Sequence, residues 1–277
     1  MHRTRSYLIN GDFNQVVSPL DRGFAYGDGV FRTMLMQNGL LECWPLHYQK
    51  LVADCAAIGI VCPSAELLMS DLQQLISKQE LTENLTSVIK IIITRGEGDR
   101  GYAAPAITNP TRVVLKTPMC RYSEGNLTNG VNLHICKTRL ATQTRLGGIK
   151  HLNRLENVMA RMEWQDENIF DGVILDQHEN AIECTMSNIF ARFDRKLITP
   201  DLSDCGVAGV TRQRIMGLAS TLNLTVEVQA LQIKKLLLAD EVIICNSLYG
   251  AFQVKKIGER KMPQQTLANT IRTLLKS

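Results

Sequence analysis

The chain has 277 residues, of which 45% are hydrophobic and 21% charged, a composition that excludes a largely disordered protein. Its formal charge of +4 comes from 31 basic and 27 acidic side chains that are interspersed along the sequence. Such a mixture is typical of a solvated surface, so we expect no nucleic-acid partner.

The apolar stretches are short. The run from Val88 to Ile93, interrupted by Lys90, has the length of a strand and falls far below the roughly 20 residues of a membrane span. The basic start Met1–Ser6 is not followed by a long apolar segment, so no signal peptide is predicted. The eight cysteines form no C-x-x-C pair. We therefore expect a cytoplasmic protein with reduced thiols and without a metal site or a membrane partner.

The first structural signal is a β-hairpin. The apolar segments 31–37 and 40–44 flank Asn38-Gly39, the dipeptide that two-residue hairpin turns favour. A helix is predicted from Pro45 to about Ile58, and another begins at Pro63-Ser64 with leucines at helical spacing. Further strands are predicted at 86–94, 111–117 and 131–138.

The segment from Arg121 to Gly130 is the richest in turn-forming residues. We predict a smaller N-terminal α+β domain over 1–120, a linker over 121–130, and a larger C-terminal α+β domain over 131–277 that carries Lys150. Within the latter, the sequence predicts in order a helix at 152–166, short strands over 171–199, a helix at 211–222 and a strand at 241–246. Because strands and helices do not alternate regularly, the fold class is α+β in two domains.

Residues Gly96–Gly101 match the G-x-G-x-x-G pattern of dinucleotide-binding sites and follow a predicted strand. That site requires a helix beginning at the last glycine, whereas Tyr102-Ala-Ala-Pro105 leads to another strand. Glu97 and Asp99 would also repel a phosphate. We therefore do not predict a dinucleotide site.

Three positions suggest chemistry, and each has a simpler explanation. Lys150 comes shortly after Gly147-Gly148, at the start of a predicted helix. As a catalytic amine it would need its pKa lowered from about 10.4 to about 7–8. As a solvated lysine at the helix start it would need no change in pKa. Glu183 is an acidic residue on an apolar strand, either an edge charge or a partner for a pyridine nitrogen. The glycine-rich start of the 211–222 helix is either ordinary or an anion site.

Taken together and in order, these motifs resemble the fold-type IV pyridoxal-phosphate enzymes of the branched-chain aminotransferase-like superfamily. The resemblance spans nearly the whole chain. Its motifs are Asp28–Phe31, Arg95–Tyr102, Gly148–Glu156, Glu183–Phe190, Gly206–Arg212 and Cys245–Leu248. It implies a homodimer with pyridoxal 5'-phosphate as cofactor.

The resemblance also implies roles for single residues. Lys150 would form the Schiff base with the cofactor, and Glu183 would pair with the pyridine nitrogen. The remaining implied cofactor contacts are Lys50, Ser187, Asn188, Gly209, Val210, Thr211 and Ser247. Arg100 and Tyr102 match positions that bind a substrate carboxylate in relatives, often from the partner subunit. Lys50 departs from the family, which usually has an arginine there to grip the phosphate with its planar fork.

Within the superfamily, the segments 95–102, 148–157 and 244–248 are most similar to the aminodeoxychorismate lyases. That resemblance implies conversion of 4-amino-4-deoxychorismate to 4-aminobenzoate and pyruvate, a step of folate biosynthesis. The implied route is an external aldimine, proton abstraction by Lys150 and elimination of pyruvate. Thr33 is a candidate for protonating the leaving pyruvate carbon, or alternatively a structural strand threonine.

Two other functions stay open from the residues. One is a D-amino-acid or branched-chain aminotransferase, which shares the cofactor machinery. The other is a binding protein that keeps the fold without the cofactor, which Lys50 in place of arginine would favour.

Overall fold

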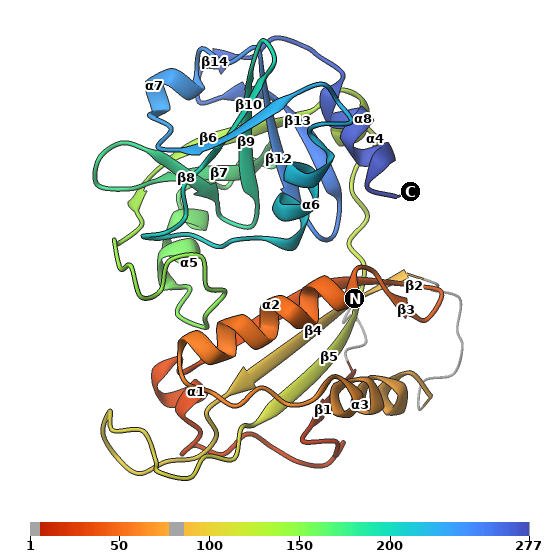
Figure 1. Cartoon of the computed structure of the whole chain (residues 1–277), viewed down its shortest axis with the longest axis vertical. Helices are drawn as coiled ribbons and strands as arrows, with labels where there is room; N and C mark the ends of the chain where they lie inside the picture. Colours follow the sequence, from red (N-terminus) through yellow and green to blue (C-terminus); the bar gives the residue numbers. More distant parts are fainter. Residues whose placement is uncertain (1–5, 78–85, 277) are drawn as a thin grey trace. The chain divides into compact units, whose positions relative to one another are not determined.

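The structure is a computed structural model that describes residues 6–77 and 86–276, so most of the basic N-terminal start lies outside the described residues. The chain divides into two compact units (Figure 1). The first contains Met1–Cys120 and Ile149–Asn153, and the second contains Arg121–Gly148 and Arg154–Ser277.

The first unit is built on an antiparallel sheet in the order β1-β5-β4-β2-β3. Its elements are β1 (Ser6–Ile9), α1 (Arg22–Tyr26), β2 (Gly29–Gln37), β3 (Leu40–Leu41), α2 (Trp44–Ala57), α3 (Ala65–Ser77), β4 (Thr86–Thr94) and β5 (Arg112–Pro118). The predicted hairpin is confirmed, because β2 and β3 pair across Asn38 and Gly39, whose φ angles of 50° and 79° are both positive. The predicted helices correspond to α2 and α3, and the predicted strands 86–94 and 111–117 to β4 and β5.

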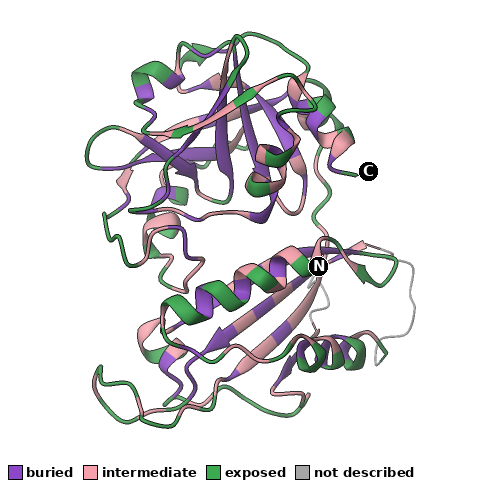
Figure 2. Ribbon diagram, in the orientation of Figure 1, coloured by how far each residue is buried: buried purple, intermediate pink, exposed green. Residues whose placement is uncertain are grey.

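The two faces of this sheet differ. One face is covered by α2 and α3, and the core between them includes Met34, Ile91 and Leu51. The other face carries Phe31 and Thr33, which alternate with the core residues along β2 and are half-buried. Figure 2 shows a similar alternation of buried and half-buried positions along β4. Any chemistry on β2 therefore depends on which face a residue occupies.

The second unit contains a larger mixed sheet in the order β11-β10-β9-β12-β13-β6-β7-β8, with β14 beside β13. Its strands are β6 (Val131–Arg139), β7 (Ile169–Leu175), β8 (Ala181–Cys184), β9 (Asn188–Phe193), β10 (Lys196–Pro200), β11 (Thr225–Gln229), β12 (Glu241–Asn246), β13 (Gly250–Ile257) and β14 (Arg260–Lys261). Its helices are α4 (Glu124–Thr128), α5 (Leu155–Arg161), α6 (Val210–Leu218), α7 (Ile233–Leu236) and α8 (Leu267–Leu274).

The central strand β12 is buried on both faces, since Val242 and Ile244 join one core cluster while Ile243 and Cys245 join another beneath α6 and α8. Figure 2 shows the central strands of this sheet as buried and the outer sides of the helices as exposed. The strand predicted at 241–246 is confirmed by β12.

The first unit ends at residue 120, but the predicted division differs from the structure in two places. Residues 121–130 belong to the second unit and contain α4, so they are not a linker. Residues 149–153, with Lys150, pack on the first unit rather than on the larger one. The reason is an open strand edge: β3 covers β2 only at Met36 and Gln37, which leaves the other end of β2 free to pair.

The helix predicted at 152–166 is shorter in the structure, where α5 begins at Leu155 and ends at Arg161. His151 forms a bridge with Val30, and Leu152 donates its backbone N–H to the carbonyl of Gly29 at 2.9 Å. Pairing with a strand competes with helix formation, so the tertiary contact delays the helix start. A helix long and apolar enough to cross a membrane does not occur among residues 6–77 and 86–276.

Candidate active site

Lys150 lies in the segment that pairs with the open end of β2. Its backbone carbonyl accepts a hydrogen bond from the N–H of Phe31 at 3.0 Å, and its own N–H donates to Asp54 Oδ2 at 3.2 Å. The ammonium nitrogen lies 4.6 Å from the centre of the Phe31 ring, a cation–π distance. Lys150 is half-buried, so it is not the fully solvated helix-start lysine that the sequence left open.

Lys50 lies on α2 in a cluster of charges. Its ammonium pairs with Asp54, one turn along the helix, and the other carboxylate oxygen of Asp54 pairs with the guanidinium of Arg32 on β2. Asp54 and Arg32 are 1% and 2% exposed. Burial, followed by the positive charge of Arg32, lowers the pKa of Lys50 to about 8. Burial also lowers the pKa of Arg32 to about 10.

Glu183 lies on β8 in the second unit. Although β8 is an edge strand, the side chain is buried, which removes the interpretation of a solvent-facing edge charge. Its Oε2 accepts a hydrogen bond from the N–H of Val207 at 2.8 Å. Gly206, with φ of 79°, brings the chain close, because a Cβ there would lie 2.8 Å from Ile182 and 3.4 Å from Glu183 Oε2. The local backbone therefore holds this carboxylate in place.

Arg154 lies within electrostatic range of Glu183. Burial lowers the pKa of Arg154, and the negative charge of Glu183 acts in the opposite direction.

The start of α6 presents backbone amides without a side-chain cap. The N-cap residue is Gly209, which has no side chain to cap the first turn. Val210 and Thr211 follow and are buried. The hydroxyls of Thr211 and Ser247 lie 3.3 Å apart. Helix-start amides without a side-chain cap, beside two hydroxyls, form an arrangement that can bind an anion. The structure thus brings together four of the predicted cofactor contacts, Gly209, Val210, Thr211 and Ser247.

Asn188 and Ser187 act within the protein itself. Asn188 accepts from the N–H of Gly209 at 3.2 Å and donates to the carbonyl of Val207 at 2.7 Å, so it ties β9 to the start of α6. Ser187 donates to the buried carboxylate of Asp171 at 2.8 Å and accepts from the hydroxyl of Tyr249 at 2.6 Å. Their contacts position the loops that surround Glu183 and Gly209, and a direct contact of either with the cofactor stays a prediction.

Arg100 and Tyr102 lie on a loop of the first unit and are exposed, Tyr102 by 87%. Arg22 supports the loop by donating to the carbonyls of Gly101, Tyr102 and Ala103 at 3.0–3.2 Å. A role of Arg100 and Tyr102 in binding a substrate stays a prediction.

The same loop contains the G-x-G-x-x-G match at Gly96–Gly101. The described residues 95–111 contain no helix, as expected from the sequence, so the match lacks the helix start that a dinucleotide site requires.

Thr33 lies on the half-buried face of β2, opposite Lys90 on β4. It shares this face with Phe31, whose ring lies 4.6 Å from Lys90 Nζ and 4.6 Å from Lys150 Nζ. Burial lowers the pKa of Lys90. Thr33 therefore occupies the face of the sheet over which the Lys150 ammonium lies, and its role stays a prediction.

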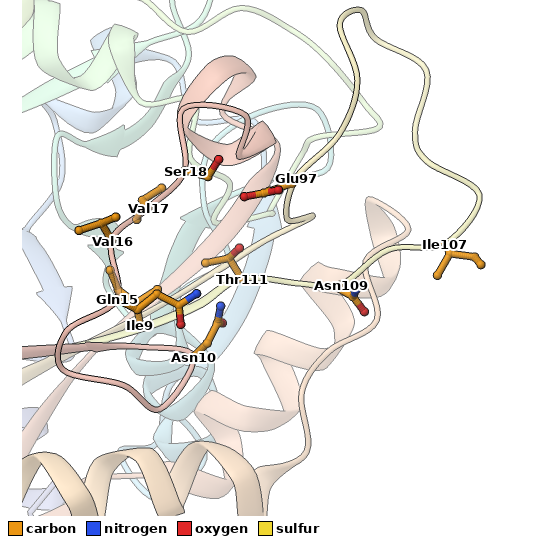
Figure 3. Close-up of a pocket in the computed structure, with 10 residues that line it drawn as sticks. All are labelled: Ile9, Asn10, Gln15, Val16, Val17, Ser18, Glu97, Ile107, Asn109 and Thr111. Carbon is orange, nitrogen blue, oxygen red and sulfur yellow. The ribbon is translucent and has the colours of Figure 1, made fainter.

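A surface pocket in the first unit lies elsewhere (Figure 3). It is lined by Ile9, Asn10, Gln15, Val16, Val17, Ser18, Glu97, Ile107, Asn109 and Thr111. None of these ten residues is a predicted site residue, and the charged one among them, Glu97, disfavours an anion. We assign no chemistry to this pocket.

Sequence reasoning missed Asp54, Arg32 and Arg154. The spacing of Lys50 and Asp54, four residues apart on a predicted helix, was a signal that the two side chains share a face. Arg32 gave no such signal, because only the pairing of β2 with its neighbours shows that it points to the core face.

Comparison with known proteins identifies the family. The model of the class IV aminotransferases matches residues 29–257, and the chain belongs to this family. The aminodeoxychorismate lyase of Vibrio harveyi is 35% identical over 252 residues, which are 91% of each chain. The D-alanine aminotransferase of Bacillus licheniformis is 26% identical over 238 residues, covering 86% of this chain and 81% of that protein.

Among solved structures, the 4-amino-4-deoxychorismate lyase from Pseudomonas aeruginosa has a TM-score of 0.91 with 37% identity, and the match covers 98% of each chain. The fold is accordingly the two-domain α+β architecture of fold-type IV, as the sequence predicted. Enzymes of this family use pyridoxal 5'-phosphate.

The residues of this chain fit that cofactor. At Gly209 a Cβ would lie 2.3 Å from Asn188 Oδ1, so the close packing of Asn188 against the start of α6 requires glycine, and that helix start has backbone amides suited to a phosphate. Glu183 is a buried carboxylate suited to a protonated pyridine nitrogen, and Lys150 is a half-buried amine with a fixed backbone. The first unit thus supplies an amine, and the second supplies an anion cradle and a carboxylate, which are the chemical groups that pyridoxal phosphate requires.

Proposed function

We propose that the protein is a pyridoxal-phosphate-dependent aminodeoxychorismate lyase, which converts 4-amino-4-deoxychorismate to 4-aminobenzoate and pyruvate. The observation that carries this proposal is the similarity to two such lyases, at 35% identity over 91% of the chain and at 37% identity with a TM-score of 0.91. The aminotransferase alternative has weaker support, since the D-alanine aminotransferase is 26% identical.

The residues divide the binding of the cofactor between them. Lys150 provides the amine that attaches it, and Glu183 holds a proton at the pyridine nitrogen. The N–H groups at the start of α6 and the hydroxyls of Thr211 and Ser247 bind the phosphate, and Lys50 adds a positive charge. When bound, pyridoxal phosphate supplies a protonated pyridine ring that accepts the electrons of a broken C–H bond.

The chemistry requires one proton to move away from the substrate and another to be delivered. With the cofactor and substrate bound, Lys150 would take the proton from C4 of the substrate. The C–O bond to the neighbouring enolpyruvyl group then breaks, the ring becomes aromatic, and the leaving carbon is protonated to give pyruvate. Thr33, on the same sheet face as Phe31, is our candidate donor of that proton.

The substrate carries two carboxylates, which favour cationic contacts. Arg100 and Tyr102 are our candidates for this role. Both residues are exposed in the single chain, which suits residues that act across a subunit interface. We therefore also propose a homodimer. We further propose a cytoplasmic location and a role in folate biosynthesis. The mass of the purified protein by light scattering tests the dimer.

The decisive experiment mixes purified protein, pyridoxal phosphate and 4-amino-4-deoxychorismate and measures 4-aminobenzoate and pyruvate together, with Lys150→Ala as the control. Equal amounts of both products from the native protein alone support the lyase. If the native protein forms neither product but converts its cofactor to the amine form with D-alanine or a branched-chain amino acid, the aminotransferase replaces it.

A further inference from the structure

The carboxylate of Asp54 is the point where three polar groups of the first unit meet. Its Oδ1 pairs with the ammonium of Lys50, and its Oδ2 pairs with the guanidinium of Arg32 and accepts the backbone N–H of Lys150 at 3.2 Å. A carboxylate has about four acceptor positions, so a single one serves all three donors.

Asp54 depends on these contacts because it is buried. Asp54 is 1% exposed, and a buried carboxylate is strongly destabilising unless charges and hydrogen bonds compensate it. Arg32, on the core face of β2, provides one of the two compensating charges, and its Nε makes no hydrogen bond within the described residues. With two cations and one anion, the cluster keeps one net positive charge for an anion.

Lysine needs such support more than arginine does. An arginine presents a rigid planar fork to a phosphate, whereas a lysine ends in a point charge on a flexible four-carbon stem. Lys50 and Asp54 are four residues apart on α2, the spacing at which helix side chains meet. The ion pair therefore restricts the ammonium to one position, which the lysine stem by itself does not.

We propose that Asp54 is a positioning residue that fixes the Lys50 ammonium for the cofactor phosphate, with Arg32 balancing its charge, so that the cluster replaces the fork of an arginine. This inference rests on the proposed cofactor. The bond from the N–H of Lys150 ties the same carboxylate to the segment that carries the Schiff-base lysine.

The cluster also controls the charge of Lys50. Charged and titratable groups around Lys50 include Asp54 on its own helix and Arg32 on β2, with Cys55 near Arg32 and Lys150 bonded to Asp54. Burial and the charge of Arg32 lower the pKa of Lys50 to about 8. Removing the opposite charge of Asp54 lowers that pKa further and leaves Lys50 neutral at a lower pH.

The test compares pyridoxal phosphate with pyridoxal, which lacks the phosphate, through their dissociation constants at a series of pH values on both sides of about 8. In Asp54→Asn, the preference for pyridoxal phosphate falls about tenfold, the loss of one charge-assisted contact. The pH above which the preference declines also moves below that of the native protein. In a Lys50→Arg background the same substitution has a smaller effect, because arginine brings its own geometry.

Asp71→Asn is the matched control. Asp71 is a carboxylate of the same unit on α3, 1% exposed and paired with Arg112 at 2.5 Å. Its loss leaves both the preference and the pH profile unchanged. Thermal melts establish that each variant folds. If Asp54→Asn does not fold, Asp54→Glu keeps the charge but displaces it, so the preference falls while the pH profile stays.

Two results overturn the inference while leaving the proposed function intact: a native preference and pH profile in Asp54→Asn, or an undiminished effect of that substitution in the Lys50→Arg background. Failure of the native protein to bind pyridoxal phosphate at all would overturn the proposed function, and this inference with it.

Discussion

The two units hold their candidate site residues by different means. In the first unit, Lys50 is held by charge: it shares the carboxylate of Asp54 with Arg32. In the second unit, Glu183 is held by a backbone N–H, and Asn188 ties the start of α6 through a backbone N–H and a carbonyl. Asp54, Arg32, Glu183 and Asn188 are all buried. In the first unit one carboxylate balances two cations, whereas in the second unit backbone groups contact Glu183 and Asn188, with the charge of Arg154 near Glu183.

This difference has a physical consequence. Ion pairs respond to pH and to the loss of either partner, because the charge left behind is uncompensated. Hydrogen bonds to the backbone respond to geometry, because the donor cannot titrate. We therefore expect substitutions in the first unit to change the pH dependence of cofactor binding, and those in the second to change its geometry at every pH.

The largest expected effect is at Glu183. In Glu183→Gln the amide oxygen can still accept the N–H of Val207, so the fold is retained, but the protonated pyridine nitrogen loses its carboxylate partner. We expect kcat to fall on the order of 100-fold or more with a small change in melting temperature. Glu241→Gln, a buried acid of the same unit that accepts from the N–H of Ala268, is the control and should keep its kcat. A native kcat in Glu183→Gln would remove Glu183 from the mechanism.

The next effect is at the start of α6. Gly209 has an ordinary φ of −74°, so Gly209→Ala acts through contact, placing a methyl group 2.3 Å from Asn188 Oδ1. We expect cofactor affinity, measured by titration of the apoprotein, to fall about tenfold at every pH. Gly217→Ala, in the same helix with nothing within 4 Å of the added Cβ, should instead stabilise the protein by about 0.5 kcal/mol. Equal affinities in both variants would contradict an anion site at this helix start.

Lys50→Met tests the charged side of the comparison. Asp54 keeps Arg32 as partner, so the fold should persist, while the phosphate loses one cation. The preference for pyridoxal phosphate over pyridoxal should fall about tenfold, and its dependence on salt should weaken. The decline of this preference above about pH 8, expected of the native protein from the pKa of Lys50, should disappear. A decline that survives the substitution would have to come from another group.

The smallest effect concerns stability. Glu163 accepts the backbone N–H groups of Lys137 and Thr138 at 2.6 and 2.8 Å. Burial acts to raise its pKa, but these and the side-chain hydrogen bonds outweigh it and bring the pKa to about 2, below the ordinary value of 4.5. The stabilisation is thus present above about pH 4.5 and is lost as the pH falls toward 2.

In Glu163→Gln we expect a loss of about 1 kcal/mol at neutral pH, seen in urea unfolding, and a flatter decline of stability in acid. Site chemistry should not change, since Glu163 lies outside the candidate site. An acid decline as steep as that of the native protein would show that other carboxylates carry it.

Much of the fold follows from local sequence. The Asn38-Gly39 turn, the helical spacing in α3 and the apolar run of β12 each specify their element through interactions between near neighbours. The prediction fails where distant segments compete. The helix predicted from residue 152 begins only at Leu155, because the residues before it pair with β2. Residues 121–130 look like a linker by composition, yet they form α4.

The candidate site divides in the same way. Lys150, Glu183 and the glycines before α6 stand in motifs that can be read from the chain, because their spacing along the sequence is itself the signal. The sequence thus determined the family resemblance, the cofactor and the residue types of the site. The tertiary structure decided that Lys150 belongs with the first unit, that Glu183 is buried, and that Asp54 joins Arg32, Lys50 and Lys150. Residues as far apart as 32 and 150 meet only after β2 has paired, and burial and charge balance are properties of that packed arrangement rather than of any segment alone.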